Sequence, residues 1–228
     1  MKARDVMVSP VITVKPSASV REVAGILVKH RISAVPVVNE QGKLVGIVSE
    51  GDLMHRSEAG TERQPSWWLL GLTREETLAV DYVKAHARHV ADVMTRDVIT
   101  TTPETPLREI AALLEKHSIK RVPVVENGQL VGIVSRANLV QAVASARQGL
   151  QISRSDAAIR DRLLAHLKQQ PWAHTGLLNV TVMDGIVDLW GCTDSDAERK
   201  AIRVAAESAE GVGAVNDNLV TRPMHGWL

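Results

Sequence analysis

The sequence predicts an α/β protein of the α+β kind, built from two βαββα repeats and a smaller αββαβ domain. Three observations support this prediction. The decapeptide LVGIVSEGDL at 44–53 returns as LVGIVSRANL at 130–139, each copy follows an amphipathic helix and a short strand, and the residues after 153 show a different order of elements. A chain of 228 residues, of which 45% are hydrophobic, can form two or three small cores.

The duplication extends far beyond the decapeptide. The segment from Asp5 to Leu53 aligns with the segment from Asp92 to Leu139. Each copy contains a VIT segment, a turn marked by Pro, a helix, a strand with a central Pro, a Gly-containing turn, the strand LVGIV and a second helix. Apolar residues recur at helical spacing in the first helix of each copy: Val20, Val23, Ala24, Leu27 and Val28, then Leu107, Ile110, Ala111 and Leu114. The turns NEQGK and ENGQ predict a β-hairpin in each repeat, covered by these helices.

Both repeats carry the signature Gly-hydrophobic-hydrophobic-Ser-x-x-Asp/Asn, from Gly46 to Asp52 and from Gly132 to Asn138. Each signature follows a strand of the form hydrophobic-Pro-Val-Val. In this respect the chain resembles a tandem pair of cystathionine-β-synthase (CBS) domains, a Bateman module, with repeat 1 over residues 1–56 and repeat 2 over residues 92–147. The resemblance implies a pseudo-two-fold pair with a cleft where adenosyl ligands bind, and a homodimer formed through the module.

The polar residues of the signature suit a nucleotide. Ser49 and Ser135 stand where a strand gives way to a helix, so each can cap the helix or offer its hydroxyl and nearby backbone N–H groups to a phosphate. Asp52 and Asn138 follow one helical turn later and are candidates for the ribose hydroxyls. Asp offers two acceptor oxygens and Asn one, so we expect the second site to bind a different ligand or to bind less tightly. The alternative is that these pairs only cap helices.

Positive charge is concentrated in the second repeat. Lys120 and Arg121 replace Ser33 and Ala34, and Arg136 replaces Glu50. By the resemblance, Arg121 is the phosphate ligand, with Lys120 and Arg136 beside it; the alternative is that these charges are simply solvated. The resemblance also implies an adenine pocket formed by Thr13, Ala34, Val35, Thr100 and Val122. The ligand could be AMP, ADP, ATP, NAD or S-adenosylmethionine, because all of these share the adenosine that the signature recognises.

Residues 57–91 form an insert between the repeats. Thr73 followed by Glu76 predicts a capping box that opens a helix reaching about His89. Trp67 and Trp68 stand out in a chain without Phe; they could anchor a partner or a membrane surface, or fold back onto the module or its dimer interface. His86 is three residues before His89, but no further ligand completes a metal site, so we expect no metal.

The last domain is predicted over residues 153–223. A helix runs from Ser155 to about Gln170, two strands flank the turn Met183-Asp184-Gly185, and a capping box at Ser195 opens a second helix before a last strand. The segments IVDLWG, TDSDAERK and GVGAVNDNL resemble a BON domain. That resemblance implies an unknown protein or phospholipid partner. From Leu150 onward we count 8 Lys and Arg against 10 Asp and Glu, a net charge of −2 that weakens recognition of anionic lipid.

Composition narrows the function further. There is no signal-like N-terminus and no apolar run near the roughly 20 residues of a membrane span, and a single Cys192 suits a reducing compartment, so we expect a cytoplasmic protein. A net charge of +1 gives no sign of a nucleic-acid partner. No catalytic set is readable, so we expect no enzyme. The sequence therefore favours a regulatory sensor that couples an adenosyl nucleotide to the BON domain; the alternative is a ligand-independent dimeric scaffold that presents BON domains.

Overall fold

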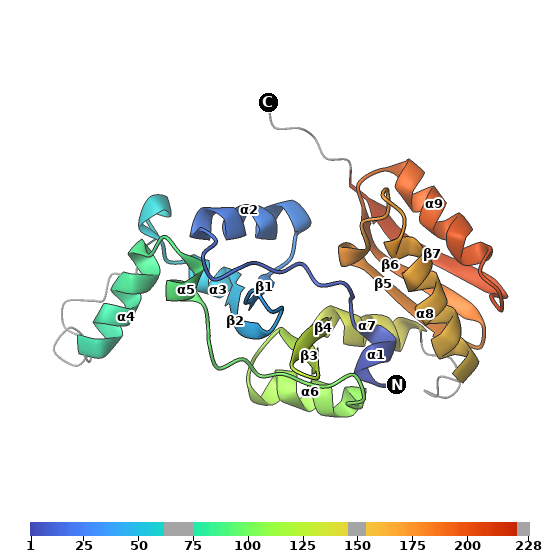
Figure 1. Cartoon of the computed structure of the whole chain (residues 1–228), viewed down its shortest axis with the longest axis horizontal. Helices are drawn as coiled ribbons and strands as arrows, with labels where there is room; N and C mark the ends of the chain where they lie inside the picture. Colours follow the sequence, from blue (N-terminus) through green and yellow to red (C-terminus); the bar gives the residue numbers. More distant parts are fainter. Residues whose placement is uncertain (62–74, 146–153, 223–228) are drawn as a thin grey trace. The chain divides into compact units, whose positions relative to one another are not determined.

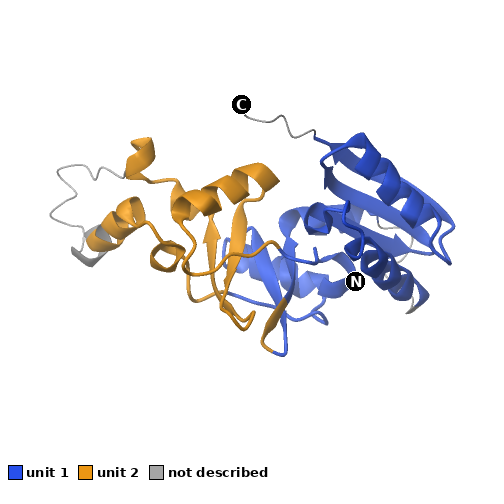
Figure 2. Ribbon diagram, turned by 45° about the horizontal axis from the view of Figure 1, so that its top comes forward, with its two compact units in different colours: residues 1–11, 99–127, 131–228 blue, residues 12–98, 128–130 orange. Residues whose placement is uncertain are grey.

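A computed structural model describes residues 1–61, 75–145 and 154–222, and it separates into two compact units (Figure 2). One unit comprises Ile12–Val98 with Gly128–Leu130 and contains the first repeat and the insert. The other comprises Met1–Val11, Ile99–Asn127 and Val131–Leu228 and contains the second repeat together with the C-terminal domain. The second repeat and the C-terminal domain are thus parts of one compact unit.

The first repeat is built on a helix and a hairpin. Ser19 accepts a hydrogen bond from the Glu22 amide and so caps α2 (Val20–His30), which buries Val20, Val23 and Leu27 in the core. Val28, predicted on the same stripe, is instead 77% exposed. Strands β1 (Ala34–Val38) and β2 (Leu44–Ser49) pair antiparallel, and α3 (Glu50–Leu53) follows as a single helical turn. All five residues of β1 are buried, which explains its unbroken run of Ala, Val and Pro.

The second repeat has the same order. Helix α6 (Leu107–Lys116), strands β3 (Arg121–Glu126) and β4 (Gln129–Ser135) and helix α7 (Arg136–Ser145) follow one another. Its core contains apolar residues of α6, both strands and α7. Helix α7 is ten residues long, whereas α3 at the matching position has four. The two copies therefore diverge after the shared serine.

The α+β class is confirmed, but the first strand of each repeat is reduced to a single β-bridge. Val14 bridges Val37 and Thr101 bridges Val124, both in parallel. Each bridge residue sits opposite a strand with a central proline, and Pro has no N–H to donate to a longer ladder. The VIT segments are consequently extended chain and not full strands.

Each repeat takes its first helical turn from the other copy of the duplicated sequence. Helix α1 (Ala3–Val6) contributes its apolar residues to the core of the second repeat, and α5 (Val90–Val93) contributes its own to the core of the first. The backbone supports this exchange through two antiparallel bridges, which join Val8 to Ile133 and Thr95 to Ile47. Neither copy of the repeat is therefore complete without residues from the other.

The exchange explains the glycine of the signature. A Cβ added at Gly132 would fall on the sulfur of Met7, and one added at Gly46 would fall on the sulfur of Met94. Both methionines belong to the duplicated tripeptide Asp-Val-Met, at 5–7 and 92–94. Glycine at these positions lets the incoming methionine lie directly against the strand.

The insert contributes η1 (Ser57–Ala59) and α4 (Glu75–His86). The predicted helix is present at 75–86, while Thr73 of the predicted capping box and the pair Trp67-Trp68 lie outside the described residues. Tyr82 and His86, one turn apart on α4, stack with ring centroids 4.2 Å apart. No helix in the described part of the chain is both long enough and apolar enough to cross a membrane.

The C-terminal domain has the predicted αββαβ order, with an extra short turn (Figure 1). Its elements are α8 (Arg154–Lys168), η2 (Thr175–Leu177), β5 (Leu178–Met183), β6 (Ile186–Thr193), α9 (Asp196–Glu207) and β7 (Ala214–Thr221). Asp184 and Gly185 both have positive φ, as a tight hairpin turn between β5 and β6 requires. β7 then pairs with β6 in parallel, after the crossover through α9.

The two faces of this three-stranded sheet differ in character. The face covered by α8 and α9 is apolar, with Val180, Val182 and Leu189 in the core. Alternate residues of β5, Asn179 and Thr181, point to the opposite face, because side chains alternate along a strand. All six residues of β5 are nevertheless buried. The polar face at β5 is covered by α7 and α1, both from the same compact unit.

Candidate ligand sites of the two repeats

In the first repeat the signature residues Ser49 and Asp52 form a closed local arrangement. Asp52 Oδ2 accepts hydrogen bonds from the Ser49 amide at 2.9 Å and from Ser49 Oγ at 2.8 Å. Asp52 Oδ1 accepts from Lys84 Nζ of α4 at 3.1 Å. The carboxylate is thus fixed by a serine of its own repeat and a lysine of the insert, with its side chain 11% exposed.

In the second repeat Ser135 and Asn138 repeat half of this pattern. Asn138 Oδ1 accepts from the Ser135 amide at 2.7 Å and from Ser135 Oγ at 2.8 Å. The other end of the amide differs, because Asn138 Nδ2 donates to Gln141 Oε1 at 3.1 Å. Asn138 is 5% exposed and counts among the buried polar residues.

The basic residues of the second repeat gather at the end of its hairpin. The Arg136 amide donates to the Lys120 carbonyl at 3.0 Å, and Arg136 Nε donates to the Ile119 carbonyl at 3.1 Å. Lys120 and Arg136 are exposed, and Arg121 is half-buried at the start of β3. The structure therefore brings these three residues to one end of the hairpin, beside Ser135. Their role in binding phosphate remains a prediction.

The residues predicted for the adenine pocket fall into two groups. Thr13 and Thr100 immediately precede the bridge residues Val14 and Thr101, so each lies beside a strand of its repeat. Thr13 is half-buried and Thr100 exposed. Ala34, Val35 and Val122 are buried, and the two valines belong to the cores of their repeats. In this structure the valine side chains support the cores, and contact with adenine remains a prediction.

Sequence reasoning missed two residues, Lys84 and Gln141, that hold the ribose candidates. Gln141 is three residues beyond Asn138 on α7, a spacing that places both side chains on one helix face. That signal was available in the sequence. Lys84 is 32 positions from Asp52 and reaches it only because α4 folds back on the repeat. No spacing rule could have found it.

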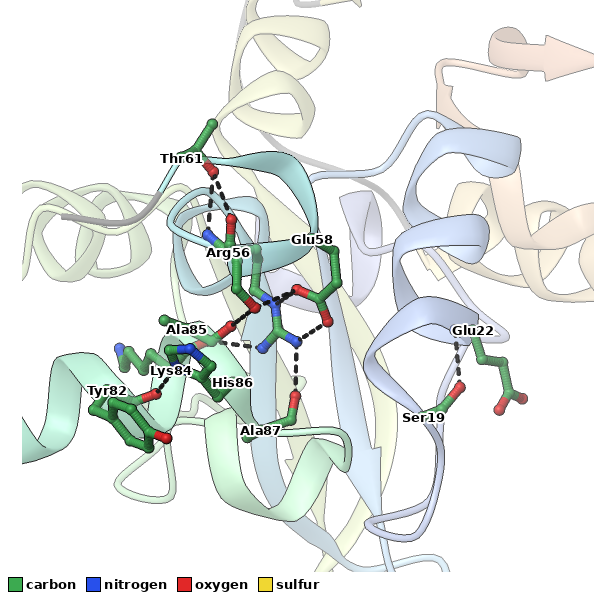
Figure 3. A network of polar contacts seen from close by, with 11 residues as sticks. Ser19, Glu22, Arg56, Glu58, Thr61, Tyr82, Lys84, Ala85, His86 and Ala87 are labelled. Carbon is green, nitrogen blue, oxygen red and sulfur yellow. Dashed lines mark hydrogen bonds and ion pairs between the residues drawn. The ribbon is translucent and has the colours of Figure 1, made fainter.

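Arg56 holds α4 in the position that this contact needs (Figure 3). Arg56 is 5% exposed, and its guanidinium donates to the carbonyls of Lys84 at 2.7 Å and Ala87 at 2.8 Å, at the C-terminal end of α4 where helical carbonyls lack partners. Two further bonds, of 2.6 and 3.0 Å, join it to Glu58. This pairing with Arg56 lowers the pKa of Glu58 to about 2.

One further group of ionisable residues lies close together in the C-terminal domain. His174, Asp194 and Glu198 place one ligand atom each within 4.8 Å of one another. Both oxygens of Glu198 already accept backbone N–H bonds at 2.8 Å, from His174 and from Asp194. Glu198 therefore ties the start of α9 to the segment before η2, a structural task that accounts for its burial.

The family models define the class of protein. The model described as CBS domain matches residues 3–59 and 90–145, and the model described as BON domain matches residues 155–223. The chain therefore belongs to the CBS-domain proteins and carries a pair of CBS domains followed by a BON domain, as the sequence motifs predicted.

Similar proteins agree with this assignment. An uncharacterized protein of Methanocaldococcus jannaschii is 34% identical over 154 residues, which cover 63% of this chain and 91% of that protein. The chloroplastic CBS domain-containing protein CBSX1 of Arabidopsis thaliana is 35% identical over 148 residues, covering 62% of this chain and 60% of that protein. The crystal structure of CBSX2 in complex with AMP matches with a TM-score of 0.55 at 29% identity, over 63% of this chain and 96% of that one.

Several other similar proteins carry enzyme names, among them transferases. The matched part covers only 14% to 22% of those proteins. The likeness to them is thus confined to a small part of each.

Proposed function

We propose that this chain is a non-catalytic regulatory protein that binds an adenine nucleotide through its CBS pair and transmits that binding to the BON domain. The observation that carries the proposal is the duplicated serine and Asp or Asn pair. In both repeats the acceptor oxygen is held by the serine amide and hydroxyl at 2.7 to 2.9 Å. Side chains fixed in this way are preorganised for a ligand, so little conformational entropy is lost on binding.

The expected roles follow from the chemistry of each side chain. Asp52 and Asn138 contact the ribose hydroxyls at the strand-to-helix junction: Asp52 offers a carboxylate acceptor, and Asn138 offers an amide nitrogen that can donate. Ser49 and Ser135 lie beside them with Lys120, Arg121 and Arg136 near the second serine, a set that suits phosphate oxygens. The first repeat has Ser33, Ala34 and Glu50 at the matching positions, and none of them is basic. The first repeat is therefore the less suitable place for a phosphate.

AMP is our first candidate among the adenosyl ligands. The related CBSX2 was crystallised with AMP, and its match covers the CBS pair. The basic residues of the second repeat also favour a phosphorylated ligand over S-adenosylmethionine. ADP, ATP, NAD and S-adenosylmethionine contain the same adenosine and belong in the same titration.

The assembly and location of the protein are further parts of the proposal. Helix α7 exposes Val140 and Val143 one turn apart, at 68% and 74%. Such an apolar pair on the CBS module supports a homodimer formed there. We propose a cytoplasmic protein whose BON domain contacts a protein or a phospholipid.

A ligand-independent scaffold is the second candidate. It is favoured by the fact that Ser49 and Asp52, and likewise Ser135 and Asn138, satisfy each other at the start of a helix. A capping role would explain both pairs without any ligand. The two candidates differ in what happens when a nucleotide is added.

Calorimetric titration of nucleotide-free protein with the five adenosyl ligands separates the candidates. We expect saturable binding of AMP, and a loss of about ten-fold or more in affinity for Asp52→Ala or Asn138→Ala, since a hydrogen bond to a charged or buried group contributes about 1.5–3 kcal/mol. Ser19→Ala is the matched control, because Ser19 caps α2 outside both sites. Absence of heat and of any thermal shift with all five ligands would favour the scaffold.

A further inference from the structure

Asn138 is not accessible as it stands. Its Oδ1 accepts two bonds from Ser135, and its Nδ2 donates to Gln141, so both ends of the amide are engaged. The backbone amide of Ser135 must meet an oxygen, which fixes the orientation of the Asn138 side chain. Because Oδ1 already accepts two bonds, a ribose oxygen has to meet Nδ2, one of whose two hydrogens already points to Gln141 in a residue that is only 5% exposed.

The bond at the Nδ2 end leads to the BON domain. Gln141 Oε1 accepts from Asn138 at 3.1 Å and from Asn179 Nδ2 at 2.7 Å. Asn179 lies on β5, on the polar face of the BON sheet. A chain of three amides thus connects the second ligand site to the BON domain, and Gln141 occupies its centre.

Further polar bonds join the BON domain to α7 and to the residues beside it. Ser145 Oγ, at the end of α7, accepts from Thr181 Oγ1 at 3.1 Å and from Trp190 Nε1 at 3.3 Å. Arg160 of α8 donates to the carbonyl of Met7 at 2.9 Å. Asn179 and Thr181 are 3% and 1% exposed, so this face is well covered.

A polar contact of this kind is suited to opening. Permanent interfaces are more apolar, whereas polar groups that separate can exchange their partners for water. Asn179 Oδ1 is buried and has no hydrogen-bond partner among the described atoms, which makes the closed arrangement costly at that position. Separation would hydrate this oxygen.

We propose that the BON domain docks reversibly on α7 and that the docked form opposes nucleotide binding at the second repeat, with Gln141 as the coupling residue. A ligand that takes Asn138 Nδ2 removes the bond to Gln141 and weakens the hold on Asn179. By linkage, docking lowers the nucleotide affinity by the same factor by which the nucleotide lowers docking. This inference rests on the proposed function, since it describes the regulation of the same site.

The test uses the full chain with Asp52→Ala, so that only the second repeat binds, and AMP as the probe. Thr181→Arg places a long side chain against Ser145 and should separate the BON domain, without entering its core on the other face of the sheet. Asn218→Arg adds the same side chain to the exposed part of β7 and serves as the control. A second variant, Gln141→Ala, removes the coupling residue and leaves the sheet unchanged.

We expect AMP affinity to rise about five-fold or more in Thr181→Arg and in Gln141→Ala, since five-fold is the lower end of ordinary allosteric couplings. The AMP affinity of Asn218→Arg should stay unchanged. AMP should also shift Trp190 fluorescence to the red as its indole leaves Ser145, a change that Trp190→Phe abolishes. Equal or weaker AMP binding in both variants would overturn the inference and leave the sensor intact. If AMP binds none of these proteins, the proposed function itself fails.

Discussion

The two repeats share a signature and hold it differently. Asp52 and Asn138 both accept two bonds from the preceding serine, but the remaining end of Asp52 meets the Lys84 ammonium of the insert, whereas that of Asn138 meets Gln141 and, through it, the BON domain. The difference matches the chemistry of each residue. A carboxylate needs a cation, and an amide needs an acceptor that another donor can share. Each repeat is therefore connected to a different accessory element.

The largest expected effect comes from filling the glycine of the signature. Gly132→Val places a side chain on Met7, and Gly46→Val on Met94, so each should destabilise its repeat by about 1–3 kcal/mol, the usual cost of overpacking. Denaturant unfolding measures the loss. Met7→Ala should recover part of the stability of Gly132→Val and none of that of Gly46→Val. Equal recovery in both would contradict the pairing of each glycine with its own methionine.

Placing the ribose candidate of the first repeat in the second repeat tests the comparison of the two repeats directly. Asn138→Asp places a carboxylate against the oxygen of Gln141, so Gln141 must turn its amide and present a nitrogen to Asn179. We expect a loss of about 1–2 kcal/mol in the free energy of unfolding, because a buried group loses its partner. Gln141→Ala should remove most of that loss in a double-mutant cycle. Additive losses would show that the two residues are not coupled.

Lys84→Met tests the ion pair with Asp52 that distinguishes the first repeat from the second. The Lys84 side chain is 41% exposed, so its ion pair with Asp52 should contribute less than about 1 kcal/mol to stability. Freed from Lys84, Asp52 Oδ1 is open to a ribose hydroxyl, and we expect AMP affinity at the first repeat to rise a few-fold. Thermal unfolding and titration of the Asn138→Ala protein measure both quantities. Unchanged or weaker AMP binding in that protein would contradict this assignment.

The smallest effect is the pH response of α4. Glu58 has its pKa lowered from 4.5 to about 2 by Arg56, so the stabilising pair is complete above about pH 4.5 and is lost as the pH falls toward 2. The effect is small because the Glu58 side chain is 64% exposed. Amide exchange in α4, corrected for its intrinsic pH dependence, should speed up over that range. Glu58→Gln should show the faster exchange already at pH 6, with no further step from this pair.

The sequence predicted local elements well because their causes are local. The Ser195 cap of α9 and the hairpin turn at Asp184-Gly185 each depend on a few neighbouring residues. The VIT segments were predicted as strands because β-branched residues favour extended chain. They form only single bridges, since the facing strand has a proline at its centre.

The candidate sites were predictable in part. The duplicated signature and the resemblance it carries identified Ser49, Asp52, Ser135 and Asn138, and the structure places each pair in hydrogen-bond contact. Arg56 gave no signal, because an arginine in a polar loop is ordinarily solvated, whereas here it is buried at the end of α4. Its role depends on where the end of α4, 28 to 31 positions further along the chain, comes to lie.

The sequence by itself determined the duplication, the signature and the order of the three domains, because repeated spacing and periodicity follow from local chemistry. Only the tertiary structure decided that the first turn of each repeat packs in the other repeat's core, that Lys84 meets Asp52 and that Gln141 links Asn138 to Asn179. These contacts join residues far apart in the chain. Their partners are selected by packing and by the need to satisfy buried polar groups, which no local pattern encodes.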